Sequence, residues 1–275
     1  MKLRFWFLLP ARIWLALLLA APLAIICVYS ALTRGAYGGV SLPATAENYA
    51  RFFDPLYAAI LWRSLLMAAA ATALCLLLGF PLALFISRAQ RWRGLYLFLV
   101  ILPFWTSFLV RTYAWLFLLR DTGLLNTILQ SLGLIREPLP LLYNNGAVLL
   151  GLVYGYLPFM ILPLYATLER MDPALLEAAA DLGAKPLAAL LRVVIPLAAP
   201  GIRAGSILVF IPCVGAFLTP DLLGGGKTVM IGNLVQNQFT TARDWPFGSA
   251  VSLALMAIVV LLVLLFLRRD TEEAL

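Results

Sequence analysis

Six long apolar runs constrain this chain more than any other feature of its sequence. A helix needs about 20 mainly apolar residues to cross the hydrocarbon of a bilayer. The runs meet or approach that length, and Arg111 is the only charge inside them: Ile13–Thr33, Ser64–Ser87, Gly94–Leu119, Gly146–Leu168, Ala204–Pro220 and Trp245–Leu267. Charged residues make up 12% of the chain, about half of the roughly 25% found in soluble domains. The sequence therefore predicts an all-α membrane protein with six transmembrane helices.

The positions of lysine and arginine predict the orientation of these helices, because both residues are enriched on the cytoplasmic side. With both termini cytoplasmic, twelve of the 20 basic residues lie in inner segments: Lys2, Arg4, Arg12, Arg88, Arg91, Arg93, Arg170, Lys185, Arg192, Arg203, Arg268 and Arg269. The outer connections, roughly 34–62, 120–145 and 221–244, are longer and hold fewer. The first run follows basic residues, as in a signal peptide, but its apolar core exceeds about 15 residues. We expect it to be a retained helix.

The segment 169–203 is the most polar part of the inner side. It carries four acidic and four basic residues between two apolar runs, so we expect a loop at the cytoplasmic face of the membrane. Its first part has the signals of a short helix. Asp172 is placed to cap the helix, Pro173 suits its first position, and Gly183 is placed to end it. Pro186 is placed to begin a second helix.

This loop resembles a known motif. The sequence Glu177-Ala178-Ala179, the glycine four residues later and Ile195-Pro196 resemble the "EAA" loop of ABC-importer permease subunits. The resemblance implies a coupling helix that docks into a groove on a cytoplasmic ATPase. It assigns the ATPase-coupling role to Glu177, Ala178, Ala179, Asp181, Gly183, Ile195 and Pro196. The alternative is an ordinary amphipathic helix lying at the membrane interface.

Further segments resemble the spermidine/putrescine permeases: Pro103–Ser107, Arg111–Trp115, Asp221–Gly225, Ile231–Asn233 and Arg243–Gly248. The resemblance implies a type I ABC importer permease fold in the bacterial inner membrane, surrounded by lipid. It implies a second permease subunit of a different chain, a dimer of the ATP-binding subunit and a periplasmic substrate-binding protein as partners. On this basis, we expect residues 1–60 to form the first helix and first periplasmic segment. Residues 61–270 would form the permease domain, and residues 271–275 a cytoplasmic tail.

A polyamine is an extended polycation, and it should be met by carboxylates and aromatic faces. The candidates along the substrate path are Trp105, Tyr113, Trp115, Asp121 and Asp221. The alternative is that the aromatic residues form an interfacial belt and that the two acids cap helices. Arg111 has three interpretations: it snorkels outward, pairs with Asp121, or contacts the partner subunit.

Several other functions are excluded or disfavoured. The chain has no histidine, and its three cysteines lie far apart in apolar runs, so no metal site is expected. The segment Gly224–Thr228 lacks the upstream glycine of a phosphate-binding loop. We therefore predict a non-catalytic subunit that binds no cofactor and no nucleic acid, with ATP and Mg²⁺ used by a separate ATPase.

Two alternatives remain for the function. The first is a permease of the same fold for another small solute, such as an amino-acid-like or opine-like compound. The second is an ion-coupled secondary transporter, which would need intramembrane acids or histidines for coupling. The six runs contain neither, so the importer is the favoured prediction.

Overall fold

The computed structural model describes residues 2–89 and 91–272, and it is mainly helical. Five helices are long and apolar enough to cross a membrane, and a bent pair makes a sixth span if it is counted as one. The chain divides into two compact units, Met1–Ala59 with Leu234–Leu275, and Ile60–Asn233. The all-α membrane fold predicted from the apolar runs is therefore confirmed.

The first unit joins the two ends of the chain. It contains α1 (Lys2–Ser30), strands β1 (Leu32–Arg34) and β2 (Val40–Ala44), α2 (Glu47–Phe52) and α13 (Trp245–Glu272). The strands pair antiparallel as a small hairpin that the sequence analysis did not anticipate. The buried Asn48 side chain donates to the carbonyls of Ser30 and Leu32, at 3.0 and 2.8 Å. These bonds attach α2 to the end of α1, and the rings of Tyr29 and Trp245 stack at 6.1 Å beside them.

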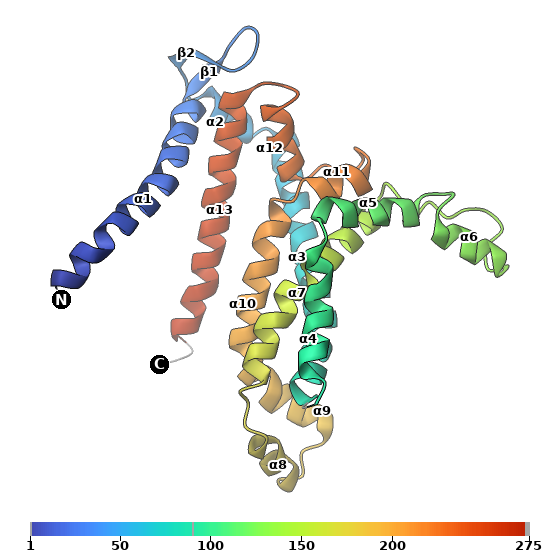
Figure 1. Cartoon of the computed structure of the whole chain (residues 1–275). Helices are drawn as coiled ribbons and strands as arrows, with labels where there is room; N and C mark the ends of the chain where they lie inside the picture. Colours follow the sequence, from blue (N-terminus) through green and yellow to red (C-terminus); the bar gives the residue numbers. More distant parts are fainter. Residues whose placement is uncertain (1, 90, 273–275) are drawn as a thin grey trace. The chain divides into compact units, whose positions relative to one another are not determined.

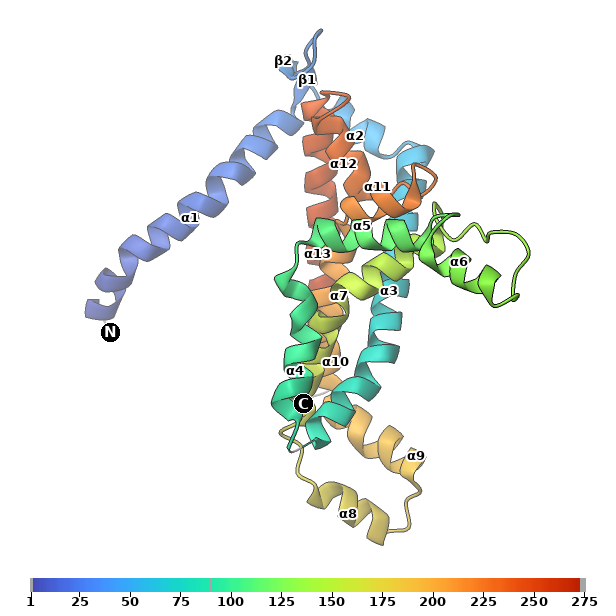
Figure 2. The same cartoon turned by 45° about the vertical axis from the view of Figure 1, so that its right-hand side comes forward.

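The second unit holds the remaining helices (Figures 1 and 2). In chain order they are α3 (Pro55–Arg88), α4 (Arg93–Ile101), the 3₁₀ turn η1 (Leu102–Trp105), α5 (Phe108–Leu119), α6 (Leu124–Ser131), α7 (Asn145–Leu168), α8 (Ala174–Asp181), α9 (Pro186–Ala189), the π turn η2 (Leu190–Val194), α10 (Ile195–Val214), α11 (Leu218–Gly224) and α12 (Ile231–Phe239). Helices α3 and α12 begin in one unit and end in the other.

Helices α7 and α10 form the most closely packed pair of the second unit. A Cβ atom at Gly201 would lie 2.8 Å from the Pro163 carbonyl oxygen, and one at Gly205 would lie 3.2 Å from the Met160 carbonyl oxygen. Small residues at such positions let helix backbones approach closely, which drives helix association in lipid, where the hydrophobic effect is absent. The two glycines therefore hold α7 and α10 together.

The third apolar run, Gly94–Leu119, forms a broken span and not one continuous helix. Helix α4 ends at Ile101, η1 follows, and the axis bends by 89° before α5 (Figure 2). Pro103 has no N–H and clashes with the preceding turn, which breaks a helix. The carbonyl of Pro103 accepts from the Thr106 backbone N–H and hydroxyl, at 3.3 and 2.7 Å. The break thus satisfies this carbonyl locally, as an apolar surrounding requires.

The fifth span begins earlier than predicted. We expected the segment 169–203 to lie outside the membrane, with a second helix beginning at Pro186, and the span to cover Ala204–Pro220. The helix does begin at Pro186, but it continues through η2 to Val214 as one candidate span. Arg192 and Arg203 therefore lie on a helix and not in a loop. The length of an apolar run indicates only the part of a helix that lies in lipid. The backbone hydrogen bonds of the same helix can continue beyond that run, through charged residues. Gly215 ends α10, and residues 218–224 form the separate helix α11.

Candidate functional site

The short helix α8 forms as its sequence signals predict. The Asp172 carboxylate accepts from the Ala174 backbone N–H at 3.0 Å, which satisfies one of the free donors at the helix start. At the other end Gly183 has a φ of +79°. Its N–H donates to the Ala180 carbonyl at 2.9 Å, and that of Ala184 donates to the Ala179 carbonyl at 3.0 Å. This is the Schellman motif, in which a left-handed glycine satisfies the last carbonyls of a helix.

Helix α8 has no buried residue. Glu177, Ala178 and Asp181 are exposed, Ala179 is half-buried, and Leu182, which follows the helix, is 89% exposed. Figure 2 shows α8 and α9 beyond the ends of α7 and α10, so this polar helix with an exposed leucine extends away from the packed spans. A short exposed helix of this kind has a surface available to another protein.

The structure divides the predicted coupling residues between two helices. Glu177 to Gly183 lie on and just after α8, whereas Ile195 and Pro196 begin α10, beyond the π turn. Ile195 is half-buried and Pro196 is exposed. The preceding Val194 is buried, and helix α8 packs against α9 and η2. The second half of the motif therefore lies in the helix that carries the loop back into the spans.

An ion pair fixes the start of this segment. Arg93, the first residue of α4, pairs with Glu169, the C-cap residue of α7. Both side chains are partly exposed, so we assign little stability to the pair. It nevertheless connects the beginning of α4 to the point where the chain leaves α7 for α8.

The five residues predicted to line the substrate path do not line either of two cavities that the structure contains. Trp105 is 75% exposed, and its ring meets that of Phe98 edge-on. Tyr113 is exposed, and the half-buried Trp115 packs edge-on against Tyr154. Asp121 and Asp221 are both exposed, and the latter lies in the first turn of α11. Their place on the surface is compatible with the aromatic belt and helix-capping alternatives.

A cavity of about 200 Å³ in the second unit involves different residues. Its walls include the rings of Phe108 from α5, Tyr156 from α7 and Phe217 from the turn before α11. Thr219, also in the wall, is 1% exposed, and its hydroxyl has no hydrogen-bond partner among the residues that the structure describes. The cavity therefore combines aromatic faces with a buried hydroxyl that lacks a partner.

No pattern in the sequence marks these four residues, because they come from three separate segments. One signal was present in the motif Ile231–Asn233. The Asn233 side chain accepts from the Met230 N–H at 3.2 Å and donates to the Phe217 carbonyl at 2.8 Å. The motif thus positions one wall of the cavity.

Arg111 lies beside the same aromatic group. Its guanidinium carbon is 4.8 Å from the ring centroid of Phe104 and 5.6 Å from that of Phe108. Its Nε and Nη1 atoms are buried and have no hydrogen-bond partner within residues 2–89 and 91–272. No ion pair joins Arg111 to Asp121 in residues 91–272, so that interpretation was wrong. The aromatic faces provide the attraction that the guanidinium has within this chain.

Comparisons with known proteins agree with this architecture. Residues 75–269 match the family described as "Binding-protein-dependent transport system inner membrane component". The chain is 45% identical to the spermidine/putrescine transport system permease protein PotB of Escherichia coli K12 over 256 residues, 93% of each protein. The Haemophilus influenzae PotB is also 45% identical, over 94% of this chain and 90% of the relative. A putative 2-aminoethylphosphonate transport system permease protein, PhnU of Salmonella typhimurium LT2, is 31% identical over 90% and 85%.

Solved structures with the same fold are more distant in sequence. A chain of a bacterial ABC transporter involved in the import of alginate superposes with a TM-score of 0.76 at 18% identity, covering 98% of this chain and 96% of its own length. A chain of the MetNI methionine ABC transporter, in inward-facing conformations, gives 0.53 at 16% identity, over 83% and 97%. These likenesses extend to the fold alone.

Proposed function

Because the chain belongs to the family of binding-protein-dependent transport system inner membrane components, we propose that it carries polyamines such as spermidine and putrescine. Membership makes it a non-catalytic, multi-pass permease subunit of an ABC importer in the bacterial inner membrane. One observation carries the polyamine assignment: 45% identity over 93% of the chain with a permease named for these two cargoes.

The chemistry of the 200 Å³ cavity supports this cargo. Aromatic faces attract ammonium groups, and the Thr219 hydroxyl can accept a hydrogen bond from one. The volume is below the roughly 300–1,000 Å³ of sites that enclose drug-sized ligands. It therefore suits one aminoalkyl end of a polyamine and not the whole molecule.

The cavity should hold a cation only weakly. No carboxylate lines it, and the positive charge of Arg111 lies 5.6 Å from the Phe108 ring that forms one of its walls. A transport path needs binding that is favourable enough for entry and weak enough for release. Selectivity would then belong mainly to a separate binding protein.

We propose that α8 is the contact with the ATPase. The complex would contain two ATPase copies, a second permease of a different chain and a periplasmic binding protein. ATP and Mg²⁺ would bind the ATPase, whereas this chain would bind no cofactor. Closure of the ATPase pair would move α8, and α9 with α10 would carry that motion into the spans as alternating access.

We place both termini, together with α8, in the cytoplasm. The density of basic residues supports this orientation. Reporter fusions at Gly183 should report cytoplasm, and fusions near Asn48 should report periplasm. The reverse pattern would contradict the orientation and the role of α8 together.

The cargo assignment is tested by reconstituting the complete complex with its binding protein. ATPase activity should rise when the binding protein is loaded with spermidine or putrescine. An amino acid, an opine and 2-aminoethylphosphonate serve as comparison cargoes. If one of these raises the rate and neither polyamine does, the polyamine assignment is wrong and the importer assignment stands.

A further inference from the structure

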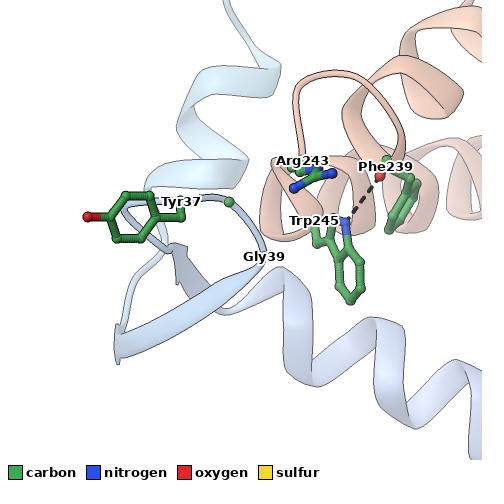
Figure 3. A pocket seen from close by; sticks show the side chains of 6 residues that line it. Tyr37, Gly39, Phe239, Arg243 and Trp245 are labelled. Carbon is green, nitrogen blue, oxygen red and sulfur yellow. Dashed lines mark hydrogen bonds between the residues drawn. The ribbon is translucent and has the colours of Figure 1, made fainter.

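A second cavity, of about 330 Å³, lies in the first unit beside the hairpin (Figure 3). It is lined by Tyr37, Gly38 and Gly39 from the loop between the strands, and by Phe239, Arg243 and Trp245 from the connection of α12 to α13. Its lining residues place it where α1 ends and α13 begins, next to the hairpin that follows α1. The cavity thus lies where these two helices meet the hairpin and the α12–α13 connection.

Backbone contacts hold the two loops against each other. The Gly39 N–H donates to the Arg243 carbonyl at 2.8 Å, and the Arg34 side chain donates to the Ala242 carbonyl at 2.6 Å. Gly38 has a φ of +93°, and a Cβ atom there would lie 2.6 Å from the Arg243 Cβ. The hairpin loop is therefore built to fit closely around Arg243.

Arg243 itself has a strained backbone. Its φ is +51°, in the left-handed region that L-residues with a Cβ seldom occupy. Such conformations cluster at binding sites, where the surrounding structure maintains them. With this backbone conformation, the Arg243 side chain lies at the cavity beside the Trp245 ring (Figure 3).

The cavity has the composition of a protein-binding hot spot. Tyrosine, tryptophan and arginine dominate the binding energy of interfaces. Tyr37 is 98% exposed, and Trp245 is partly exposed with its Nε1 donating to the Phe239 carbonyl at 3.1 Å. The Tyr37 ring is therefore open to a partner, and the Trp245 ring is held in place by this bond and by its stacking on Tyr29 while part of it stays exposed.

Arg243 is the only charged side chain in the lining, and it forms no side-chain hydrogen bond or ion pair with residues 2–89 or 91–272. The adjacent carboxylate, Asp244, is buried and already engaged. It binds Arg51 at 3.0 Å and accepts from the Phe247 N–H at 3.2 Å. The cavity therefore offers a positive charge to a group from outside the chain.

We propose that this cavity receives an aspartate or glutamate side chain of the periplasmic binding protein when that protein delivers its cargo. The proposal rests on the proposed function and orientation, which place the hairpin in the periplasm. A polyamine cannot be the occupant, because Arg243 would repel it. A carboxylate fits the guanidinium through paired N–H donors, and the aromatic rings would surround its aliphatic stem.

The test uses the complete complex in lipid vesicles with its binding protein, loaded with whichever cargo stimulates the wild type. Arg243→Asn removes the charge while keeping a residue that tolerates a left-handed backbone. The concentration of binding protein needed for half-maximal ATPase stimulation should rise roughly 5–30-fold, as for loss of a hot-spot residue. Arg243→Lys should recover part of the loss, and ATPase activity without binding protein should stay unchanged.

Arg136→Gln is the matched control, because it removes an exposed arginine from another outer connection. It should leave the half-maximal concentration unchanged. Arg243→Glu should be worse than Arg243→Asn, because it would place two carboxylates together. Equal stimulation in wild type, Arg243→Asn and Arg243→Glu would overturn the proposal.

A lipid phosphate is the other chemistry that could engage Arg243. In that case Arg243→Asn would alter ATPase activity according to the anionic lipid content, with or without binding protein, and the proposal would be wrong. Failure of the polyamine assignment would appear differently, as a wild-type complex that polyamine-loaded binding protein does not stimulate.

Discussion

Gly183 gives the sharpest test of the proposed coupling role of α8. Its left-handed backbone disfavours any residue with a Cβ atom, whereas the space around it would admit one. Its φ of +79° ends α8, and a Cβ atom there would meet no heavy atom within 4 Å. Alanine should therefore cause no clash inside the chain. It should nevertheless cost about 1–2 kcal/mol, the penalty for placing a residue with a Cβ in the left-handed region.

That penalty acts on the end of α8 alone. Losing the left-handed turn breaks the bonds from Gly183 to Ala180 and from Ala184 to Ala179. A cost of 1–2 kcal/mol lowers the ratio of correctly ended to frayed α8 by roughly 5–30-fold. The loop lies outside the apolar spans, so insertion into the membrane should be normal. Asparagine tolerates the left-handed region, and Gly183→Asn should remain near wild type.

The assay is co-purification of the ATPase with tagged permease, together with stimulation of ATPase activity by loaded binding protein. Both should fall in Gly183→Ala and much less in Gly183→Asn. Gly133→Ala is the control, since Gly133 also has a positive φ and open surroundings but lies in the connection between α6 and α7. Normal coupling in Gly183→Ala, or a larger defect in Gly183→Asn than in Gly183→Ala, would refute the argument from backbone conformation.

Three further predictions concern the two units. Thr219→Val should raise the midpoint of thermal unfolding slightly or leave it unchanged, because it removes a buried hydroxyl that has no partner among the described residues. It should also raise the KM for polyamine uptake. A KM equal to that of the wild type would show that Thr219 does not lie on the transport path. Arg51→Met should cost about 3–5 kcal/mol by leaving the 3% exposed Asp244 carboxylate unpaired. Asp244→Asn should lower the free energy of unfolding by less, because the Arg51 side chain that it leaves unpaired is 38% exposed and can be hydrated. Thermal unfolding in detergent compares the two variants. A larger loss in Asp244→Asn than in Arg51→Met would contradict the prediction. Gly201→Ala should cost about 1–3 kcal/mol through overpacking against α7, whereas Gly215→Ala, which meets nothing within 4 Å, should be neutral in the same measurement.

Local chemistry explains which features could be predicted from the sequence. Apolar run length is a direct requirement of the bilayer, so the spans from Asn145 and from Trp245 were found close to their observed starts. Helix-end signals are equally local. Asp172 and Gly183 therefore made the short helix α8 predictable within a chain that is otherwise apolar.

Predictions failed where a backbone break or a continuing helix depended on more than composition. A proline such as Pro103 can break a helix, but nothing in its neighbourhood indicated a bend of 89°. The second helix was predicted to begin at Pro186, but its charged residues Arg192 and Arg203 gave no sign that it continues into the span. The composition of a segment indicates whether lipid or water surrounds it, whereas its backbone hydrogen bonds determine whether it is helical.

The sequence by itself determined the membrane class, the family and the position of the short helix α8, because each depends on residues adjacent in the chain. Only the tertiary structure decided which residues surround a cavity. Phe108, Tyr156 and Thr219 meet because three helices pack together, and Tyr37 meets Arg243 because two distant loops exchange backbone hydrogen bonds. Such sites depend on contacts between distant segments, and no pattern along a single segment records those contacts.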